Sequence, residues 1–516
     1  MSSLQGKEAA LDYRTGIRLD PTDERPLFQQ ITDQIAERAR SGAYPVGFRL
    51  PPTRNLAREL GTHRNTVVRA FEELSAMGVI TSTVGRGTFI AARPLHKAEH
   101  APPLAPGLSW GRLLSKRLES ATLARVDRLA PAAASGDVIQ LHRMQPSPEL
   151  LPTELFRRSM EHVLRTSKGR SLGYAPREGL PALRQQIAEG LSADGVPVRA
   201  EDVLITSGSQ QALDLLARAF IDPGDGVILE APSYSGAINV FAASGATLYG
   251  VPWDDQGPDL AFLDQPAVRT AKAFYLMPNC RNPTGTTVTE ARRDEILRWS
   301  RATGVPLIED DYGADINLDE TPPPAALRAR DPDVLYMGTF SKKLIPALRV
   351  GYLVCPAAIR PRLVSLKHAA DLGTSLLLQA ALSEFLDRGY LRAHLKKTLA
   401  AYRARRDALE EALEEHMPTG VEWSHVERGV LLWLRLPRRT DPEAVYRAAE
   451  RRGVLVTPGN LSSPSDISVP GLRLTFCAEP PERLREGARR LAQAVTEVLG
   501  RSGTQSRAAE EQLSVV

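Results

Sequence analysis

Apolar residues in the first ninety positions recur with the period of a helix. An amphipathic helix is predicted from Pro26 to Ser41, with its apolar residues four positions apart: Leu27, Ile31, Ile35 and Ala39. Two shorter helices are predicted over residues 53–60 and 63–77, joined at Gly61, which can adopt the left-handed conformation that ends helices. The last helix has an inner apolar face and an outer polar one, formed by Val67, Val68, Phe71 and Leu74 and by Arg64, Asn65, Thr66 and Arg69. This pattern predicts a helix-turn-helix.

A short β segment follows these helices. Residues 79–90 alternate β-branched residues around Gly85 and Gly87, which predicts a two-stranded wing with Arg86 at its tip. Exposed arginines such as Arg54 can reach DNA phosphates, and the N-terminal end of the third helix can reach base edges in the major groove. By pattern alone, a small helical domain that binds protein is an equal alternative.

The pattern changes beyond Asp137, where short apolar runs alternate with longer amphipathic segments. Strands are predicted over residues 203–206, 226–230, 273–277, 305–309, 334–337 and 350–354. Helical segments such as residues 210–220 and 291–303 lie between them. Alternation of this kind predicts a mainly parallel sheet with helices on both faces, in which ligands bind at the carboxyl ends of the strands.

Composition and length complete the predicted domain organisation. The 516 residues, 42% of them hydrophobic and 24% charged, are typical of a soluble chain with at least two domains. Three distant cysteines indicate neither disulfides nor zinc, and the absence of an apolar segment long enough for export or insertion predicts a cytoplasmic protein without membrane contact. The expected parts are an N-terminal extension (1–24), a DNA-binding domain (25–92), a linker rich in Ala, Pro and Arg (93–136), an α/β domain (137–500) and a frayed polar tail (501–516).

Chemically distinctive residues follow five of the predicted strands. After the first of these strands, a helix is predicted to begin at the small residues Gly208 and Ser209, followed by Gln210. Free N–H groups at the start of such a helix can hold a phosphate. The others are Tyr234, Asn282 before a proline, the carboxylates of residues 309–311 before Tyr312, and Lys342 with Arg349 seven residues later. Each has an ordinary alternative, such as a strand-to-helix turn, a core tyrosine or a solvated lysine.

One ligand accounts for all five features together, namely pyridoxal 5′-phosphate. Its phosphate needs N–H groups and an arginine, and its ring needs an aromatic side chain. Its phenolic oxygen needs Asn and Tyr donors, its ring nitrogen a carboxylate, and its aldehyde a lysine. A lysine that is partly desolvated beside another cation, here Lys343, can condense with the aldehyde. The combination therefore indicates a cofactor site more strongly than any one residue.

Several segments resemble known families. Residues 26–31, 47–54, 56–61, 64–71 and 85–89 resemble the α+β winged helix-turn-helix of GntR-type bacterial transcription regulators. The resemblance implies that DNA is contacted by Arg54, Arg64, Asn65 and Thr66, with the wing near the minor groove. Arg69 and Arg86 are further candidates for DNA contact because they lie on the outer face of the third helix and at the wing tip.

Residues from about 140 to 498 resemble a fold-type I aminotransferase, in the motifs at 282–285, 309–312, 341–342 and 348–351. The resemblance implies that Lys342 binds the cofactor aldehyde as the internal aldimine and that Asp310 pairs with the pyridine nitrogen. The two-residue spacing to Tyr312 favours Asp310 over Asp311. The remaining implied contacts are Asn282 and Tyr312 at the phenolic oxygen, Tyr234 on the ring, and Gly208, Ser209, Gln210 and Arg349 at the phosphate.

Two more residues come from the same resemblance. Tyr174 resembles the tyrosine that reaches the phosphate of a partner subunit, and Arg473 matches the arginine that grips a substrate carboxylate through two hydrogen bonds. Residues 427–430 and the insertion 460–470 depart from the aminotransferase pattern, which implies a reshaped substrate pocket.

The whole chain resembles the MocR/GabR subfamily of GntR regulators. The resemblance implies a homodimer that binds double-stranded operator DNA and senses an amino acid or amine as an external aldimine at Lys342. An active aminotransferase with an accessory interaction domain is the alternative, and some transamination is compatible with the intact set of site residues. A regulator that uses its second domain only as a dimerisation scaffold is a third interpretation, against which the intact Lys342, Asp310 and Arg349 argue.

Overall fold

The computed structural model forms two compact units, Met1–Leu113 and Leu114–Val516. It describes residues 15–20, 23, 25–40, 43–83, 87–91, 113–115, 137–313, 315–319, 321–465 and 467–513. Most of the predicted linker, and Arg86 at the predicted wing tip, lie outside the described residues. Each unit has a core of its own.

The first unit is built from three helices and a small antiparallel sheet. The helices are α1 (Leu27–Arg40), α2 (Thr53–Glu59) and α3 (Arg64–Ala76), and the sheet has the order β1 (Arg49–Leu50), β3 (Gly87–Ile90), β2 (Ile80–Thr83). The predicted apolar stripe of α1 is buried at Ile31 and Ile35, both fully inaccessible. On α3, Val67, Phe71 and Leu74 are buried as predicted, whereas Val68 is only half-buried.

Two local details differ from the prediction. Helix α3 begins at Arg64 with His63 as its N-cap, because the backbone of His63 is still extended, at φ −76° and ψ 143°. Residues 15–20, expected to belong to a separate extension, pack on the first unit. Ile17 is buried in its core, and the Thr15 hydroxyl donates a 2.6 Å hydrogen bond to Glu59.

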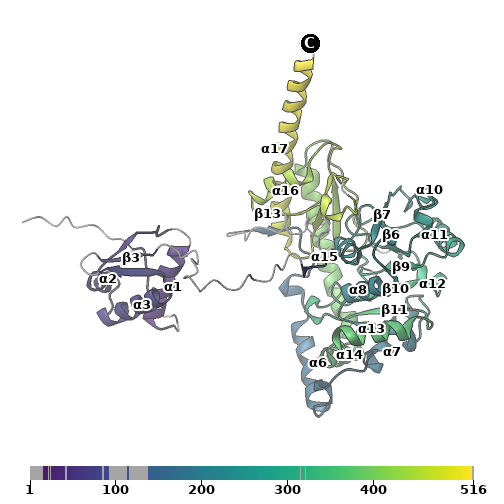
Figure 1. The fold of residues 1–516 in the computed structure, drawn as a ribbon, viewed down its shortest axis with the longest axis horizontal. Helices are drawn as coiled ribbons and strands as arrows, with labels where there is room; N and C mark the ends of the chain where they lie inside the picture. The colour runs from purple at the N-terminus through teal and green to yellow at the C-terminus, as the bar shows by residue number, and fades with distance from the viewer. Residues whose placement is uncertain are drawn as a thin grey trace, which may run out of the picture. The chain divides into compact units, whose positions relative to one another are not determined.

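The second unit contains a seven-stranded sheet (Figure 1). Its strands, in spatial order, are β5 (Val203–Thr206), β11 (Gly351–Val354), β10 (Leu335–Thr339), β9 (Leu307–Asp310), β8 (Ala273–Leu276), β6 (Gly226–Glu230) and β7 (Thr247–Val251). Six of these seven strands run in the same direction, and β11, which is antiparallel to both β10 and β5, runs in the opposite one. Its first residues therefore lie at the edge where the parallel strands end, which brings Arg349 to the same edge as Lys342.

Strand β7 was missed by the sequence prediction. It lies at the edge of the sheet and pairs with β6, and most of its residues are half-buried rather than buried. An edge strand with a glycine, Gly250, lacks the continuous apolar pattern of the central strands.

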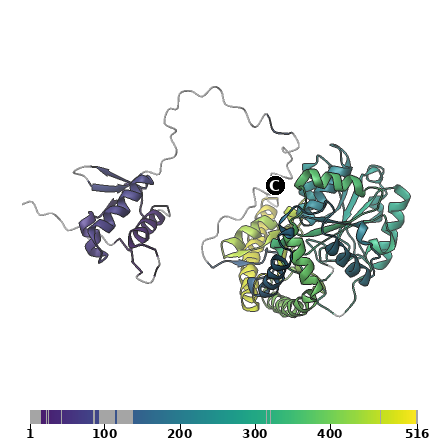
Figure 2. The same cartoon turned by 90° about the horizontal axis from the view of Figure 1, so that it is seen from below.

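Helices cover both faces of the sheet (Figure 2). Helices α8 (Ser209–Phe220), α9 (Ser235–Ala243) and α13 (Arg360–Asp371) contribute to the core on one face. Helices α7 (Pro181–Ala193), α14 (Leu376–Asp387) and α11 (Glu290–Thr303) pack on the other. Consecutive residues of each strand thus point to two different layers.

The end of the chain forms a smaller layer around the sheet β12 (Leu431–Arg435), β15 (Gly471–Thr475) and β14 (Thr457–Pro458). It packs with α15 (Tyr390–His416), α16 (Pro442–Glu450) and α17 (Pro481–Leu513). The tail predicted to be frayed over residues 501–516 is instead helical as far as Leu513, because α17 continues to that residue (Figure 1). No helix in the described part of the chain is long and apolar enough to cross a membrane.

Candidate functional site

A cavity of about 100 Å³ lies at the carboxyl edge of the sheet. Its walls come from the ends of β8, β9 and β10, the start of α8, and the residues just before β11. The structure brings together in it most of the predicted cofactor residues: Ser209, Gln210, Tyr234, Asn282, Asp310, Tyr312, Lys342 and Arg349. Gly208 precedes this set as the N-cap of α8. Residues that are distant in the sequence thus share one small space.

Lys342 follows β10 and is the amine of the cavity. Its Nζ donates a 2.8 Å hydrogen bond to the carbonyl of Met144. Burial lowers the pKa of this lysine, and the positive charges of Arg473 and Arg349 act in the same direction. A lowered pKa makes the neutral, nucleophilic amine more accessible near neutral pH.

Asp310 and Asp311 are separated by the alternation of strand β9. Asp310 lines the cavity, and its Oδ2 accepts a 2.8 Å hydrogen bond from the Tyr275 hydroxyl. Its Oδ1 is buried and accepts no hydrogen bond from the described residues. Burial raises the pKa of Asp310 to about 7. Asp311 accepts a hydrogen bond from Tyr336 and lines a different cavity, so the geometry favours Asp310 as the carboxylate of this site.

The start of α8 forms a cradle of backbone N–H groups beside Arg349. Gly208 has φ +83°, and a Cβ atom there would lie 2.6 Å from Nη2 of Arg349, so only glycine lets the guanidinium approach this closely. The Gln210 amide donates to the carbonyl of Gly236, and its oxygen accepts from the Tyr234 hydroxyl. Gln210 therefore orients the aromatic residue of the site.

Arg473 reaches the site from β15. Its Nη1 donates to Oδ1 of Asn282 at 3.3 Å, and its Nη2 donates to the His142 carbonyl and the Thr457 hydroxyl, each at 3.0 Å. Its Nε is buried without a hydrogen-bond partner among the described residues. Arg473 is thus joined directly to Asn282, one of the predicted cofactor contacts.

Tyr312 lies beside these residues at the end of β9. Its hydroxyl donates a 2.7 Å hydrogen bond to the carbonyl of Cys280. Burial raises the pKa of Tyr312, so its phenol keeps its proton and remains a donor at neutral pH.

Tyr174 does not line this cavity and is 85% exposed. The departures from the aminotransferase pattern also lie elsewhere. Arg428 is buried and donates to the carbonyls of Thr321 and Pro322. In the insertion, the carbonyl of Ser462 accepts a hydrogen bond from the backbone N–H of Ser233.

Sequence reasoning missed Met144, Tyr275 and Thr339. Met144 and Thr339 line the cavity, and Tyr275 holds Asp310 from the neighbouring strand β8. Thr339 precedes Lys342 by three residues and could have been found from that segment. Met144 lies 198 residues from Lys342 and belongs to no motif, although its carbonyl accepts from Lys342 and its sulfur accepts a 3.6 Å hydrogen bond from the Asn282 amide.

The first unit presents the predicted DNA-contacting residues on α2 and α3. Arg54, Arg64 and Asn65 are exposed, and Thr66 is half-buried. Arg69 is exposed too, with its guanidinium 3.8 Å from the centre of the Phe28 ring on α1.

A further arginine, Arg49 of β1, was not singled out from the sequence. It is exposed and lies against Gly87, at the base of the wing. Arg49 is thus exposed like Arg64 and Asn65 of α3.

Comparisons with known proteins agree with this architecture. The model of aminotransferase class I and II matches residues 146–491, and that of the bacterial regulatory proteins of the gntR family matches residues 27–90. The uncharacterized HTH-type transcriptional regulator YdfD of Bacillus subtilis is 30% identical, over 92% of this chain and 98% of its own. The probable rhizopine catabolism regulatory protein MocR of Rhizobium meliloti is 31% identical, over 92% and 95%.

A solved structure extends the likeness to the second unit. LysN, the alpha-aminoadipate aminotransferase of Thermus thermophilus complexed with N-(5′-phosphopyridoxyl)-L-leucine, is 33% identical with a TM-score of 0.69, over 76% of this chain and 100% of that one. The winged helix-turn-helix and the fold-type I aminotransferase domain, with its mainly parallel sheet, are therefore confirmed. The chain belongs to the GntR family of bacterial regulatory proteins, in the group that carries an aminotransferase class I and II domain, as MocR does.

The described residues fit pyridoxal 5′-phosphate. Asp310 has a buried oxygen without a hydrogen-bond partner among them, and Lys342 has an amine of lowered pKa. Gly208 lets the backbone approach the guanidinium of Arg349 closely. In the described part of the chain, no group of three or more His, Cys, Asp or Glu residues could hold a metal ion.

Proposed function

We propose that this protein is a transcriptional regulator that binds operator DNA through α2 and α3 and responds to an amino acid or amine bound in the cavity of its second unit. The observation that carries the proposal is the presence, in one chain, of an exposed polar face at the start of α3 and a buried cavity built around Lys342. An enzyme has no need of the first feature.

The cofactor is pyridoxal 5′-phosphate, which supplies an aldehyde for amine capture and an electron-withdrawing ring. Lys342 would bind it covalently, and Asp310 would hold the proton on its ring nitrogen. The backbone of residues 208–210 and Arg349 would hold its phosphate. Asn282 and Tyr312 would contact its phenolic oxygen, and Tyr234 would cover its ring.

Arg473 is the residue that would bind an effector carboxylate. It donates to Asn282 and has a buried Nε without a partner among the described residues, so a bidentate carboxylate would satisfy that donor. Its rearrangement would change the contacts of Asn282 and so link effector binding to the cofactor site. The bound compound would shift the protein between two conformations that differ in DNA affinity.

The assembly we propose is a cytoplasmic homodimer. Tyr174 supports it, because this residue is 85% exposed in one chain and is the tyrosine expected at the partner's phosphate. Two DNA-binding units in a dimer recognise paired half-sites. The residues that would contact DNA in each half-site are Arg54, Arg64, Asn65 and Thr66, with Arg69 on the phosphates and the wing, including Arg86, beside the minor groove.

The test is selection of duplexes from a random-sequence DNA library with the full-length protein, followed by binding measurements on the enriched sequence. Arg64→Ala is expected to weaken binding by roughly tenfold or more, since a base contact by arginine contributes about 1–3 kcal/mol. Arg25→Ala is the matched control, because Arg25 is already paired with Asp23 and Asp33. Equal enrichment of all sequences would contradict the proposal.

The effector is sought by titrating amino acids and amines while recording the visible absorption of the bound cofactor, with Lys342→Ala as control. We expect a lasting spectral shift with one compound, and the same compound should change DNA affinity. An active aminotransferase is the second candidate, because the cavity holds most of the expected groups. Release of an oxo acid from the added amino acid would support it.

A further inference from the structure

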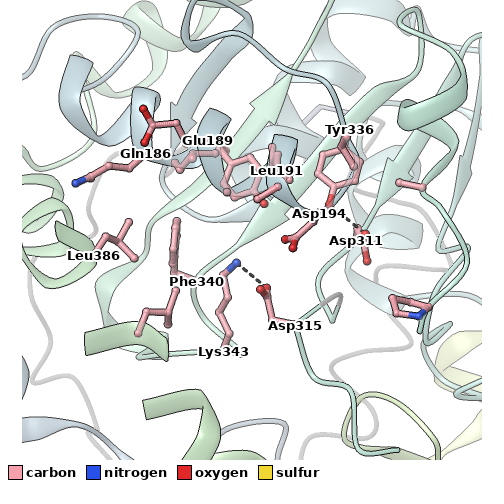
Figure 3. Close-up of a pocket in the computed structure, with 18 of the residues that line it drawn as sticks. Gln186, Glu189, Leu191, Asp194, Asp311, Asp315, Tyr336, Phe340, Lys343 and Leu386 are labelled. Carbon is pink, nitrogen blue, oxygen red and sulfur yellow. Dashed lines mark hydrogen bonds and ion pairs between the residues drawn. The ribbon is translucent and has the colours of Figure 1, made fainter. Parts of the chain in front are cut away.

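A second and larger cavity, of about 860 Å³, has walls that include Tyr336, Phe340 and Tyr352, which belong to the core on the face of the sheet covered by α7 and α14. Figure 3 shows the residues around it. Its walls come from α7, residues 322–326, the end of α14, the start of α15, strands β10 and β11, and Asp311 just after β9. Asp311 and Lys343 line it, whereas their sequence neighbours Asp310 and Lys342 line the cofactor cavity. A volume of several hundred Å³ is typical of small-molecule sites.

The charges of this second cavity are unbalanced. The described residues that line it include five carboxylates and two cations: Glu189, Asp194, Asp311, Asp315 and Asp387, and Lys343 and Arg392. Lys343 is paired with Asp315 at 2.6 Å and so neutralises one of the five. Figure 3 shows this pair with Asp194 and Asp311 around the same space. The excess of negative charge favours a positively charged ligand.

Asp311 has an unused acceptor in this cavity. Its side chain is 7% exposed, and Oδ2 accepts a 3.0 Å hydrogen bond from the Tyr336 hydroxyl. Oδ1 is buried and has no hydrogen-bond partner among the described residues. A buried carboxylate oxygen without a donor costs free energy, which a donor on a ligand would recover.

Asp194 and the apolar wall favour the same kind of ligand. Burial raises the pKa of Asp194, and the neighbouring charge of Asp315 adds to this effect, so a cation placed between these carboxylates would be stabilised. Leu191 and Leu386 line the apolar side with Phe340, whose ring centre already lies 4.8 Å from the Lys343 ammonium. Aromatic faces of this kind attract cations.

We propose that this cavity binds a small organic cation. Its ammonium, amidinium or guanidinium group would lie among Asp194, Asp311 and Asp315, and its apolar part would lie against Leu191 and Leu386. The site is separate from the cofactor cavity and does not depend on the proposed regulatory function. The ligand would contact Asp311, the residue that follows β9, whereas Asp310, the last residue of β9, lines the cofactor cavity.

The test is calorimetric titration of the full-length holoprotein with benzamidine, which combines an amidinium with an apolar ring and is a poor nucleophile toward an aldehyde. We expect Asp194→Asn to weaken binding at least about tenfold, since a hydrogen bond to a charged group contributes roughly that much. Leu386→Trp is a second variant, expected to weaken binding by narrowing the apolar side of the cavity where the ring of the ligand would lie. Asp255→Asn, in an exposed loop, is the matched control for the loss of one negative charge.

Neutral benzamide separates charge recognition from simple filling of an apolar space. It is expected to bind at least about tenfold more weakly than benzamidine, because it lacks the positive charge. The proposal is overturned if wild-type protein binds no benzamidine at millimolar concentration, if benzamide binds equally well, or if both cavity variants bind benzamidine as the wild type does. Circular dichroism of each variant confirms that it is folded.

Discussion

Neighbouring residues of this chain belong to different sites because they point to opposite faces of one sheet. Asp310 and Lys342 line the cofactor cavity, and Asp311 and Lys343 line the cavity behind it. In a strand the side chains alternate, so a shift of one position exchanges the two environments. This alternation separates Asp310, the last residue of β9, from Asp311, whereas Lys342 and Lys343 are separated by the turn that follows β10, which ends at Thr339.

At Gly208 the absence of a side chain leaves room for the guanidinium of Arg349. We expect Gly208→Ala to weaken the retention of pyridoxal phosphate by about tenfold, because the new methyl group would displace the guanidinium from the phosphate site. Cofactor affinity is measured by its visible absorbance on dialysis. Gly224→Ala is the control, since Gly224 also has a positive φ but no atom within 4 Å of the position that a Cβ would take. Equal loss in both variants would mean that backbone strain alone is responsible.

At the scale of elements, His425 connects α15 to the loop that contains Asp319. Its Nδ1 lies 2.7 Å from Glu410 of α15, and its Nε2 lies 3.2 Å from Asp319. The hydrogen bond to Glu410 raises the pKa of His425 above its ordinary value. The protonated imidazole therefore contributes stability that is complete below about pH 6.5 and is lost as pH rises through the raised pKa.

We expect His425→Gln to destabilise the second unit at acidic pH and to have a diminishing effect as pH rises above that raised pKa. Urea unfolding followed at a series of pH values measures the difference. His416→Gln, on α15, is the control, because its nearest carboxylate is 3.9 Å away. A difference that grows with pH would contradict the assigned sign.

At the scale of the whole molecule, the chain has two compact units whose cores share no residues. The first unit is small and depends on few buried side chains, of which Ile31 and Ile35 are fully inaccessible. Small domains bury a smaller fraction of their surface and are less stable. The two units are therefore expected to unfold in separate transitions.

Ile35→Ala is expected to lower only the transition of the first unit, by roughly 2–5 kcal/mol in its free energy of unfolding. Leu413→Ala, at an equally inaccessible position in the core of the second unit, is the matched variant and is expected to lower only the other transition. Differential scanning calorimetry of the full-length protein separates them. A single transition that moves in both variants would show that the units unfold together.

The sequence by itself determined the local elements and the kinds of residue at the strand ends. The three helices of the first unit and six strands of the large sheet follow from apolar periodicity, because burial of one face or of both faces leaves a pattern in consecutive residues. The motifs around Asn282, Asp310 and Lys342 could be recognised for the same reason, since each is contained in a few adjacent positions.

Only the tertiary structure decided which of these groups meet. The contact of Lys342 with the Met144 carbonyl and that of Arg473 with Asn282 join residues 198 and 191 positions apart, and a backbone carbonyl leaves no mark in the sequence. The antiparallel direction of β11 and the edge position of β7 were also decided by pairing between strands. Side-chain alternation assigned Asp311 to a second cavity, because the face on which a side chain lies depends on the register of the whole sheet.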